Sequence, residues 1–147
     1  RLVPLGAMDY VAVASPDFAR AHAPNGLSPH NFSRIPFMAF NRKDDMQAEF
    51  VGKAFGLKRV SLSQMFVPSS EGQVRAVLAG WGASVVPALL VRDLMAAGRL
   101  VDLLPGKVLP IQLYWHCWNL ESDVLDALST ALSAGAARVL HDALPSA

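Results

Sequence analysis

Short apolar runs alternate along this chain with segments that show helical periodicity. Strand-like runs are expected at residues 11–14, 35–40, 60–67, 83–86, 100–104 and 111–118. Helices are expected at residues 16–21, 44–56, 70–80 and 87–98, and from residue 122 onward. Strands that alternate with helices predict an α/β fold with a largely parallel sheet that is covered by helices.

Capping residues support these boundaries. Asp44 or Asp45 stands at the N-cap of the second helix, with Gln47 in the capping-box position, and Ser70 with Gln73 forms the same pattern in the third helix. Ser122 is predicted to cap the final helix. The expected apolar face of that helix consists of Leu125, Leu128, Leu132, Val139 and Leu140.

Length and charge restrict the class of protein. The chain has 147 residues, which is enough for one compact domain with a real core. Its 13 basic and 12 acidic residues give a net charge of +1 without a basic cluster, which argues against nucleic-acid binding by this segment. No apolar run reaches the roughly 20 residues of a membrane span. The chain opens on Arg1 rather than Met, so we expect it to begin within a larger protein.

No catalytic, metal or cofactor motif emerges from the sequence. His22, His30, His116 and His141 lack the spacing of a ligand set, and no phosphate-binding loop or dinucleotide fingerprint is present. Cys117 is the single cysteine, which excludes an intrachain disulfide and fits a reducing cytosol. It lies in an alternating aromatic run, so an inert buried thiol is expected. We therefore expect no enzyme activity, no cofactor and no metal.

Polar residues gather at two strand-to-helix junctions, residues 40–45 and 67–71. Open α/β sheets bind ligands at the carboxyl ends of their strands, near helix N-termini. The second junction offers the hydroxyls of Ser69 and Ser70 together with free backbone N–H groups, an arrangement that suits a carboxylate. Ordinary helix capping explains the same residues, and the pattern alone leaves both interpretations open.

The chain as a whole resembles the effector-binding domain of LysR-type transcription regulators. The resemblance begins with Val67-Pro68-Ser69-Ser70-Glu71 and continues through residues 76–82, 85–87 and 98–101. Residues 4–16, 40–45 and 113–118 resemble the branch that controls basic amino-acid export, also called chromosome-initiation inhibitors. One departure is Ala83-Ser84, where that branch usually has a bulkier pair.

The resemblance implies a type 2 periplasmic-binding-protein-like fold. Residues 9–118 would form the second regulatory subdomain, and residues 119–147 would carry the C-terminal helix that returns to the first subdomain. The N-terminal winged helix-turn-helix would be absent from this chain. The full-length protein would be a cytoplasmic homodimer or tetramer that contacts DNA only through that missing domain.

The resemblance also implies a small-molecule effector, lysine or arginine, and a set of contacts. Ser69 and Ser70 would donate hydrogen bonds to the effector carboxylate. Asp44, Asp45 or Glu71 would pair with the cationic end, because a buried cation needs such a partner. Asn41 would help to hold the α-amino group.

Two other classes of protein remain in view. A periplasmic solute-binding protein for a small carboxylate or amino acid would have a signal peptide and a complete first lobe upstream. An enzyme on a similar scaffold would show a triad, a metal site or a cofactor fingerprint, since fold does not determine function.

Overall fold

The computed structural model describes residues 1–142, and the chain divides into two compact units. The first unit combines Arg1–Asp9 with the chain from Pro110 onward, and the second is Tyr10–Leu109. The strands are β1 (Leu2–Ala14), β2 (Pro36–Ala39), β3 (Ser63–Phe66), β4 (Ala83–Pro87), β5 (Val101–Asp102) and β6 (Leu109–His116). The helices are α1 (Pro16–His22), α2 (Met46–Phe55), α3 (Ser70–Leu78), α4 (Ala88–Ala96) and α5 (Asp123–Val139), with a 3₁₀ turn at Phe32–Arg34.

The sheet of the second unit has the strand order β3-β2-β4-β1-β5. Strand β2 runs parallel to β3 and β4, whereas β1 runs antiparallel to both β4 and β5. The α/β prediction is confirmed, but the sheet is mixed rather than largely parallel. The difference arises because β1 lies between β4 and β5 instead of beside β2, which follows it in the chain.

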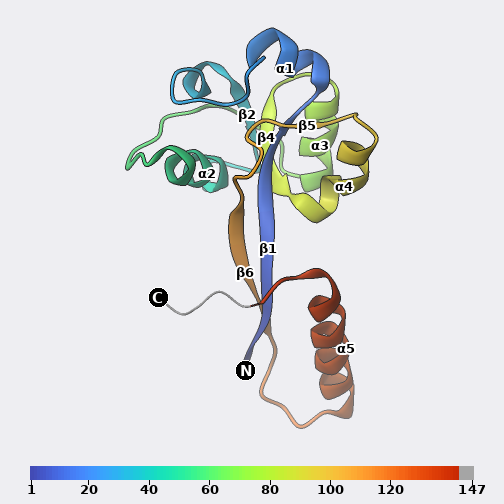
Figure 1. The fold of residues 1–147 in the computed structure, drawn as a ribbon. Helices are drawn as coiled ribbons and strands as arrows, with labels where there is room; N and C mark the ends of the chain where they lie inside the picture. The colour runs from blue at the N-terminus through green and yellow to red at the C-terminus, as the bar shows by residue number, and fades with distance from the viewer. Residues whose placement is uncertain (143–147) are drawn as a thin grey trace. The chain divides into compact units, whose positions relative to one another are not determined.

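Helices cover both faces of this sheet. Figure 1 shows α2 on one side of β4 and α3 and α4 on the other. Val77 of α3 and Val91 of α4 pack with Val11, Val13 and Met38 of the strands in one buried cluster. Phe50 and Val51 of α2 are also buried. The strands appear in the sequence as apolar runs because helices cover them on both faces.

Gly82 allows β4 to begin beside β2. A Cβ atom at this position would lie 2.2 Å from the carbonyl oxygen of Pro36, which is closer than any real contact. The parallel pairs Phe37–Ala83 and Met38–Ser84 follow directly after it. Glycine at residue 82 therefore sets how closely the two strands can approach.

Two local predictions in this unit hold only in part. Asp45 occupies the N-cap position of α2, but its side chain caps no N–H group, and Gln47 is buried instead of completing a capping box. The Gln47 amide donates to the Met38 carbonyl, because the start of α2 packs onto β2. Strand β3 is shorter and more exposed than the half-buried strand expected at residues 60–67, because it is an edge strand with β2 as its one neighbour in the described part of the chain.

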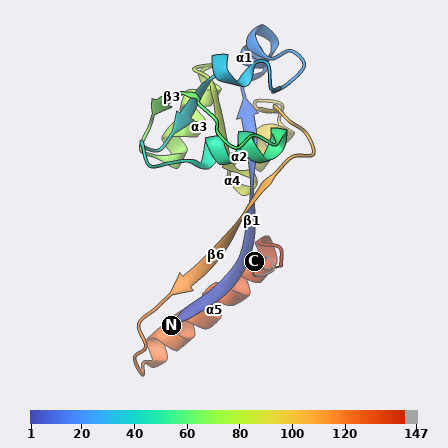
Figure 2. The ribbon, with the colours of Figure 1, turned by 90° about the vertical axis from the view of Figure 1, so that its left-hand side faces the viewer.

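The first unit contains the start of β1, strand β6 and helix α5. Figure 2 shows α5 running alongside β1 and β6. Ser122 accepts a hydrogen bond from the Leu125 N–H at 3.3 Å, so the predicted cap of α5 is confirmed. His141 bridges to Ala7 through both of its backbone groups. The predicted C-terminal segment 119–147 extends past the described residues at 143–147, and the division at residue 118 stays a prediction.

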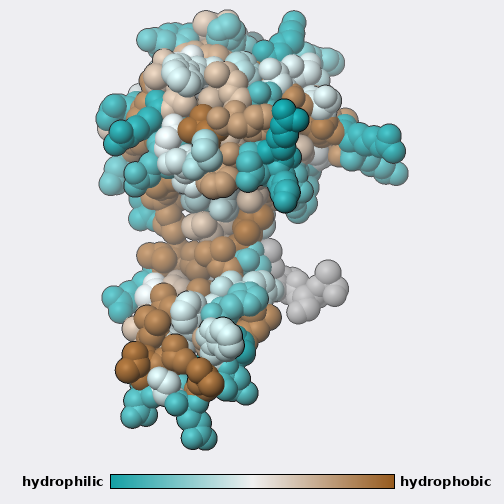
Figure 3. Space-filling model, turned by 180° about the vertical axis from the view of Figure 1, so that it is seen from behind, coloured by the Kyte–Doolittle hydropathy of each residue, from teal (hydrophilic) through white to brown (hydrophobic). Residues whose placement is uncertain are grey.

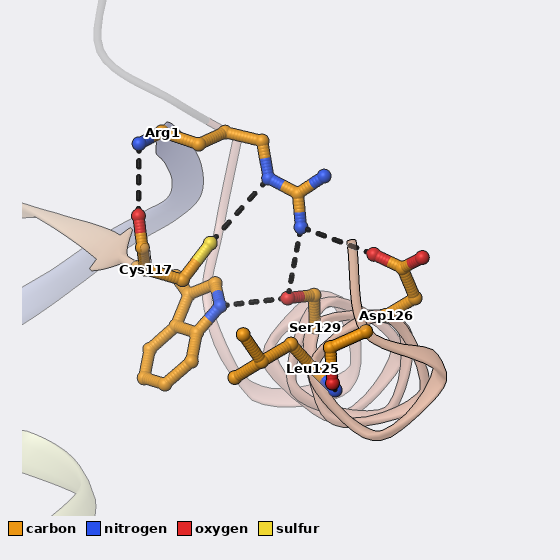
Figure 4. A network of polar contacts seen from close by, with 7 residues as sticks. Arg1, Cys117, Leu125, Asp126 and Ser129 are labelled. Carbon is orange, nitrogen blue, oxygen red and sulfur yellow. Dashed lines mark hydrogen bonds and ion pairs between the residues drawn. The ribbon is translucent and has the colours of Figure 1, made fainter. Parts of the chain in front are cut away.

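Polar contacts join β1, β6 and α5 within the first unit (Figure 4). The Trp115 indole N–H donates to Ser129 Oγ at 2.8 Å, and Arg1 contacts Ser129 Oγ at 3.4 Å and Asp126 at 3.5 Å. Arg1 Nε also donates to Cys117 Sγ at 3.4 Å. This contact lowers the pKa of the Cys117 thiol, so the expected inert buried thiol is a half-exposed cysteine beside a cation.

The apolar side chains of α5 are only partly covered within the described part of this chain. No residue of α5 is buried, and on its predicted apolar face Leu128 and Val139 are exposed. Leu2, Trp118 and Leu120 are exposed in the same unit. Figure 3 shows hydrophobic surface gathered over this part of the molecule. Apolar surface of this kind is typical of a face that packs against another segment or another chain.

Candidate functional site

A small cavity of ≈ 220 Å³ opens in the second unit where β2 and β4 end and α3 begins. Its position fits the rule that α/β sheets bind ligands at strand ends near helix N-termini. Its lining consists of Tyr10, Phe40, Asp44, Met46, Ser70, Gln73, Val85, Val86 and Pro87. Apolar walls with a few polar groups directed at one space are typical of a site for a small ligand.

Asp44 supplies the one acidic side chain of this cavity among the described residues. Its Oδ2 accepts a hydrogen bond from the Phe40 N–H at 2.9 Å, and its Oδ1 accepts one from the Met46 N–H at 3.0 Å. The carboxylate therefore closes the loop between β2 and α2 while it contributes to the cavity wall. Oδ2 also lies 3.5 Å from Gln47 Nε2, so Oδ1 is the oxygen with a further lone pair that can accept a hydrogen bond from a ligand.

Tyr10 faces the same space from β1. Burial raises the pKa of its phenol, and the negative charge of Asp44 raises it further. The phenol therefore stays protonated across the physiological range, where it can both donate and accept a hydrogen bond.

The two serines at the start of α3 have different roles. Ser69 is the N-cap and accepts a hydrogen bond from the Gly72 N–H at 3.0 Å, whereas Ser70 lines the cavity. The predicted capping box of Ser70 and Gln73 is wrong, because the helix begins at Ser70 and the cap falls one residue earlier. Gln73 instead turns into the protein, where its amide donates to the Val67 carbonyl at 3.2 Å.

The structure brings together two of the six residues that the sequence singled out. Asp44 and Ser70 line the cavity, and Ser69 caps the helix next to it. Asn41 accepts a hydrogen bond from the Lys43 N–H within its own loop. Asp45 and Glu71 lie outside the cavity lining, and Asp45 borders a separate open hollow along α2 that also contains Glu49, Lys53 and Lys58.

Sequence reasoning missed Tyr10, Gln73, Phe40 and Met46 as cavity residues. The local pattern places Tyr10 next to a strand and Gln73 in a capping box. A polar residue next to the apolar stripe of α3 was the available signal for Gln73, since a buried amide needs hydrogen-bond partners. No sequence pattern points to Tyr10, because β1 approaches α3 only through the tertiary fold.

Residues 1–142 contain neither a group of side chains placed to bind a metal nor a membrane-spanning helix. Within that range, no group of three or more His, Cys, Asp or Glu side chains is placed to hold a metal ion. No helix in the same range is long and apolar enough to span a bilayer.

Comparison with known proteins identifies clear relatives. The family model described as the LysR substrate binding domain matches residues 1–135. The transcriptional regulator ArgP of Vibrio vulnificus is 37% identical over 128 residues, covering 87% of this chain and 43% of the relative. ArgP of Pseudomonas aeruginosa is 39% identical over 132 residues, covering 90% and 43%. The chain thus spans less than half the length of these curated relatives, which are named as transcriptional regulators.

Solved structures of LysR-type proteins also match this chain. The C-terminal domains of a LysR family protein from Agrobacterium tumefaciens match with a TM-score of 0.89 and 41% identity, covering 97% of this chain and 68% of that one. ArgP from Mycobacterium tuberculosis matches with a TM-score of 0.90 and 33% identity, covering 98% and 49%. LysG from Corynebacterium glutamicum with bound effector Arg matches with a TM-score of 0.80 and 27% identity, covering 96% and 48%.

Proposed function

This chain belongs to the LysR substrate-binding domain family, and we propose that it senses lysine or arginine for a LysR-type transcription regulator. The observation that carries the proposal is the cavity that holds Asp44, Ser70 and Tyr10 together at the ends of β2 and β4. A relative with 27% identity and a TM-score of 0.80 has been solved with arginine as its effector, which supports the same class of ligand.

The chemistry of the cavity suits an amino acid. The Ser70 hydroxyl and the Tyr10 phenol are donors for a carboxylate, and Asp44 is an acceptor for an ammonium or guanidinium group. The volume of ≈ 220 Å³ is below the roughly 300–1,000 Å³ of pockets for drug-sized ligands. The cavity of the second unit is therefore small, and its polar groups suit one end of a small zwitterion.

Asn41, Asp45, Ser69 and Glu71 remain proposed contacts. Each is the sequence neighbour of a cavity-lining residue, namely Phe40, Asp44 or Ser70. Their side chains would act on a cationic effector from the edge of the loop, where solvent weakens the attraction. We therefore expect Asp44 to contribute more to affinity than Asp45 or Glu71.

The full-length protein would act in the cytoplasm as a homodimer or tetramer. Its DNA contacts would come from a part of the protein outside this chain, because a net charge of +1 with scattered basic residues provides no phosphate-binding surface. Effector binding would favour one arrangement of the regulator over another and so change transcription of amino-acid transport genes.

Isothermal titration of the full-length protein with L-lysine and L-arginine tests the proposal. We expect binding of at least one of them, and a loss of affinity of about tenfold or more for Asp44→Asn and for Ser70→Ala. Ser15→Ala is the matched control, because it removes the cap of α1 and lies outside the cavity lining. Unchanged affinity in the double variant Asp44→Ala and Asp45→Ala would exclude the acidic contacts.

A further inference from the structure

Ser84 lies at the centre of a buried hydrogen-bond network beneath the cavity. It belongs to β4, and none of its surface is exposed. Its Oγ lies 3.0 Å from the Met38 carbonyl oxygen and 3.2 Å from Gln73 Oε1. One hydroxyl group in the middle of the sheet thus contacts both β2 and α3.

Two arms extend from Ser84 to the two loops of the cavity. On one side, Gln73 accepts from Ser84 and donates to the Val67 carbonyl at 3.2 Å, which ties α3 to the loop that precedes it. On the other side, the Met38 carbonyl also accepts from Gln47 Nε2 at 3.1 Å, and the same amide lies 3.5 Å from Asp44 Oδ2. The network therefore connects cavity-lining Gln73 with cavity-lining Asp44.

The single hydroxyl proton of Ser84 has two possible acceptors, and they differ in whether another side chain already donates to them. The Met38 carbonyl already receives a hydrogen bond from Gln47, whereas within residues 1–142 Ser84 is the donor to Gln73 Oε1. Gln73 is 5% exposed, so its oxygen would lose its hydrogen bond without gaining water. The hydroxyl thus determines which way the Gln73 amide is turned.

We propose that Ser84 is a positioning residue of the effector cavity, which donates its hydroxyl proton to Gln73 Oε1 and so holds the Gln73 amide in the arrangement that binds the ligand. This inference rests on the proposed function of the cavity. A bulkier apolar residue at this position would break the connection between the two loops.

The matched pair of variants is Ser84→Ala and Ser15→Ala in the full-length protein. Ser15 is also buried and also hydrogen-bonded, accepting from the Phe18 N–H at 3.2 Å, but it caps α1 and does not line the cavity. Both variants lose a buried hydrogen bond and should unfold at lower temperature. In titrations with L-lysine and L-arginine, Ser84→Ala should weaken binding about five- to tenfold, whereas Ser15→Ala should leave affinity unchanged.

A double-mutant cycle separates positioning from general destabilisation. If Ser84 acts through Gln73, Ser84→Ala should cause little further loss of affinity in a Gln73→Leu background. Additive losses, equal losses in Ser84→Ala and Ser15→Ala, or unchanged affinity in Ser84→Ala would each overturn the proposal.

A ligand-free measurement distinguishes its failure from that of the proposed function. The side-chain amide NMR signals of Gln73 and Gln47 should shift in Ser84→Ala and stay in place in Ser15→Ala. If the wild type binds neither amino acid, the effector assignment fails while these signals still report whether Ser84 orients Gln73. Unshifted amide signals would overturn the positioning role itself.

Discussion

Asp44 Oδ2 accepts a hydrogen bond from the Phe40 N–H at 2.9 Å, so the acidic group of the cavity also holds its own loop closed. A substitution at residue 44 therefore changes local structure as well as charge. This double role distinguishes Asp44 from Asp45, whose side chain makes no capping hydrogen bond at the start of α2.

Asp44→Ala should lower the free energy of unfolding by about 1–2 kcal/mol, because two backbone N–H groups lose their acceptor. Asp45→Ala should change it by less than about 0.5 kcal/mol, as for an ordinary surface residue. Chemical denaturation of both variants measures the difference. Equal losses would show that the Asp44 hydrogen bonds do not stabilise the loop.

Gly82→Ala should be strongly destabilising, by about 3 kcal/mol, because the new Cβ would collide with the backbone oxygen of Pro36. Gly135→Ala makes the same chemical change, but its expected effect on stability is opposite. It lies in α5 with no atom within 4 Å of the added Cβ, so it should stabilise the helix by about 0.5–1 kcal/mol. Thermal unfolding of the two variants should shift in opposite directions, and a shift of Gly82→Ala to higher temperature would contradict the packing at β2 and β4.

The contact of His141 with Asp9 should depend on pH. His141 Nε2 lies 2.8 Å from Asp9 Oδ1, and this hydrogen bond raises the pKa of the imidazole above its ordinary value. Because the pKa is raised in the folded state, the stabilisation is complete below about pH 6.5 and is lost as the pH rises through the raised value. NMR titration of His141 should give a raised pKa that falls in Asp9→Asn; an equal pKa in the two proteins would exclude the contact.

Cys117 should react faster with iodoacetamide than an unstructured cysteine does at the same pH. The hydrogen bond from Arg1 Nε lowers the pKa of the thiol and increases its thiolate fraction near neutrality. Arg1→Ala should slow the reaction, whereas Arg20→Ala, which removes an arginine that pairs with Asp17 on α1, should not. Equal rates in wild type and Arg1→Ala would show that the contact does not activate the sulfur.

Local pattern predicted the elements of this fold well, because helix caps and apolar periodicity depend on neighbours in the chain. Ser122 caps α5 as expected, and the alternation of Trp115 and Cys117 with exposed Tyr114 and His116 is observed at the end of β6. The same local reasoning misplaced the cap of α3 by one residue and assigned Gln47 and Gln73 to capping boxes. Instead, the Gln47 amide donates to the Met38 carbonyl of β2, and the Gln73 amide donates to the Val67 carbonyl in the loop before α3.

Residue type and spacing were sufficient to establish an alternating α/β chain with polar strand-to-helix junctions, since both are encoded locally, whereas the regulator family was indicated by the resemblance of its motifs. The antiparallel place of β1 beside β4, which brings Tyr10 to the same cavity as Asp44 and Ser70, came instead from three-dimensional packing. The same is true of the connection that Ser84 makes between the two loops. The reason is that such contacts join residues far apart in the chain, and the packing of helices on the sheet selects them from many pairings that the local pattern allows.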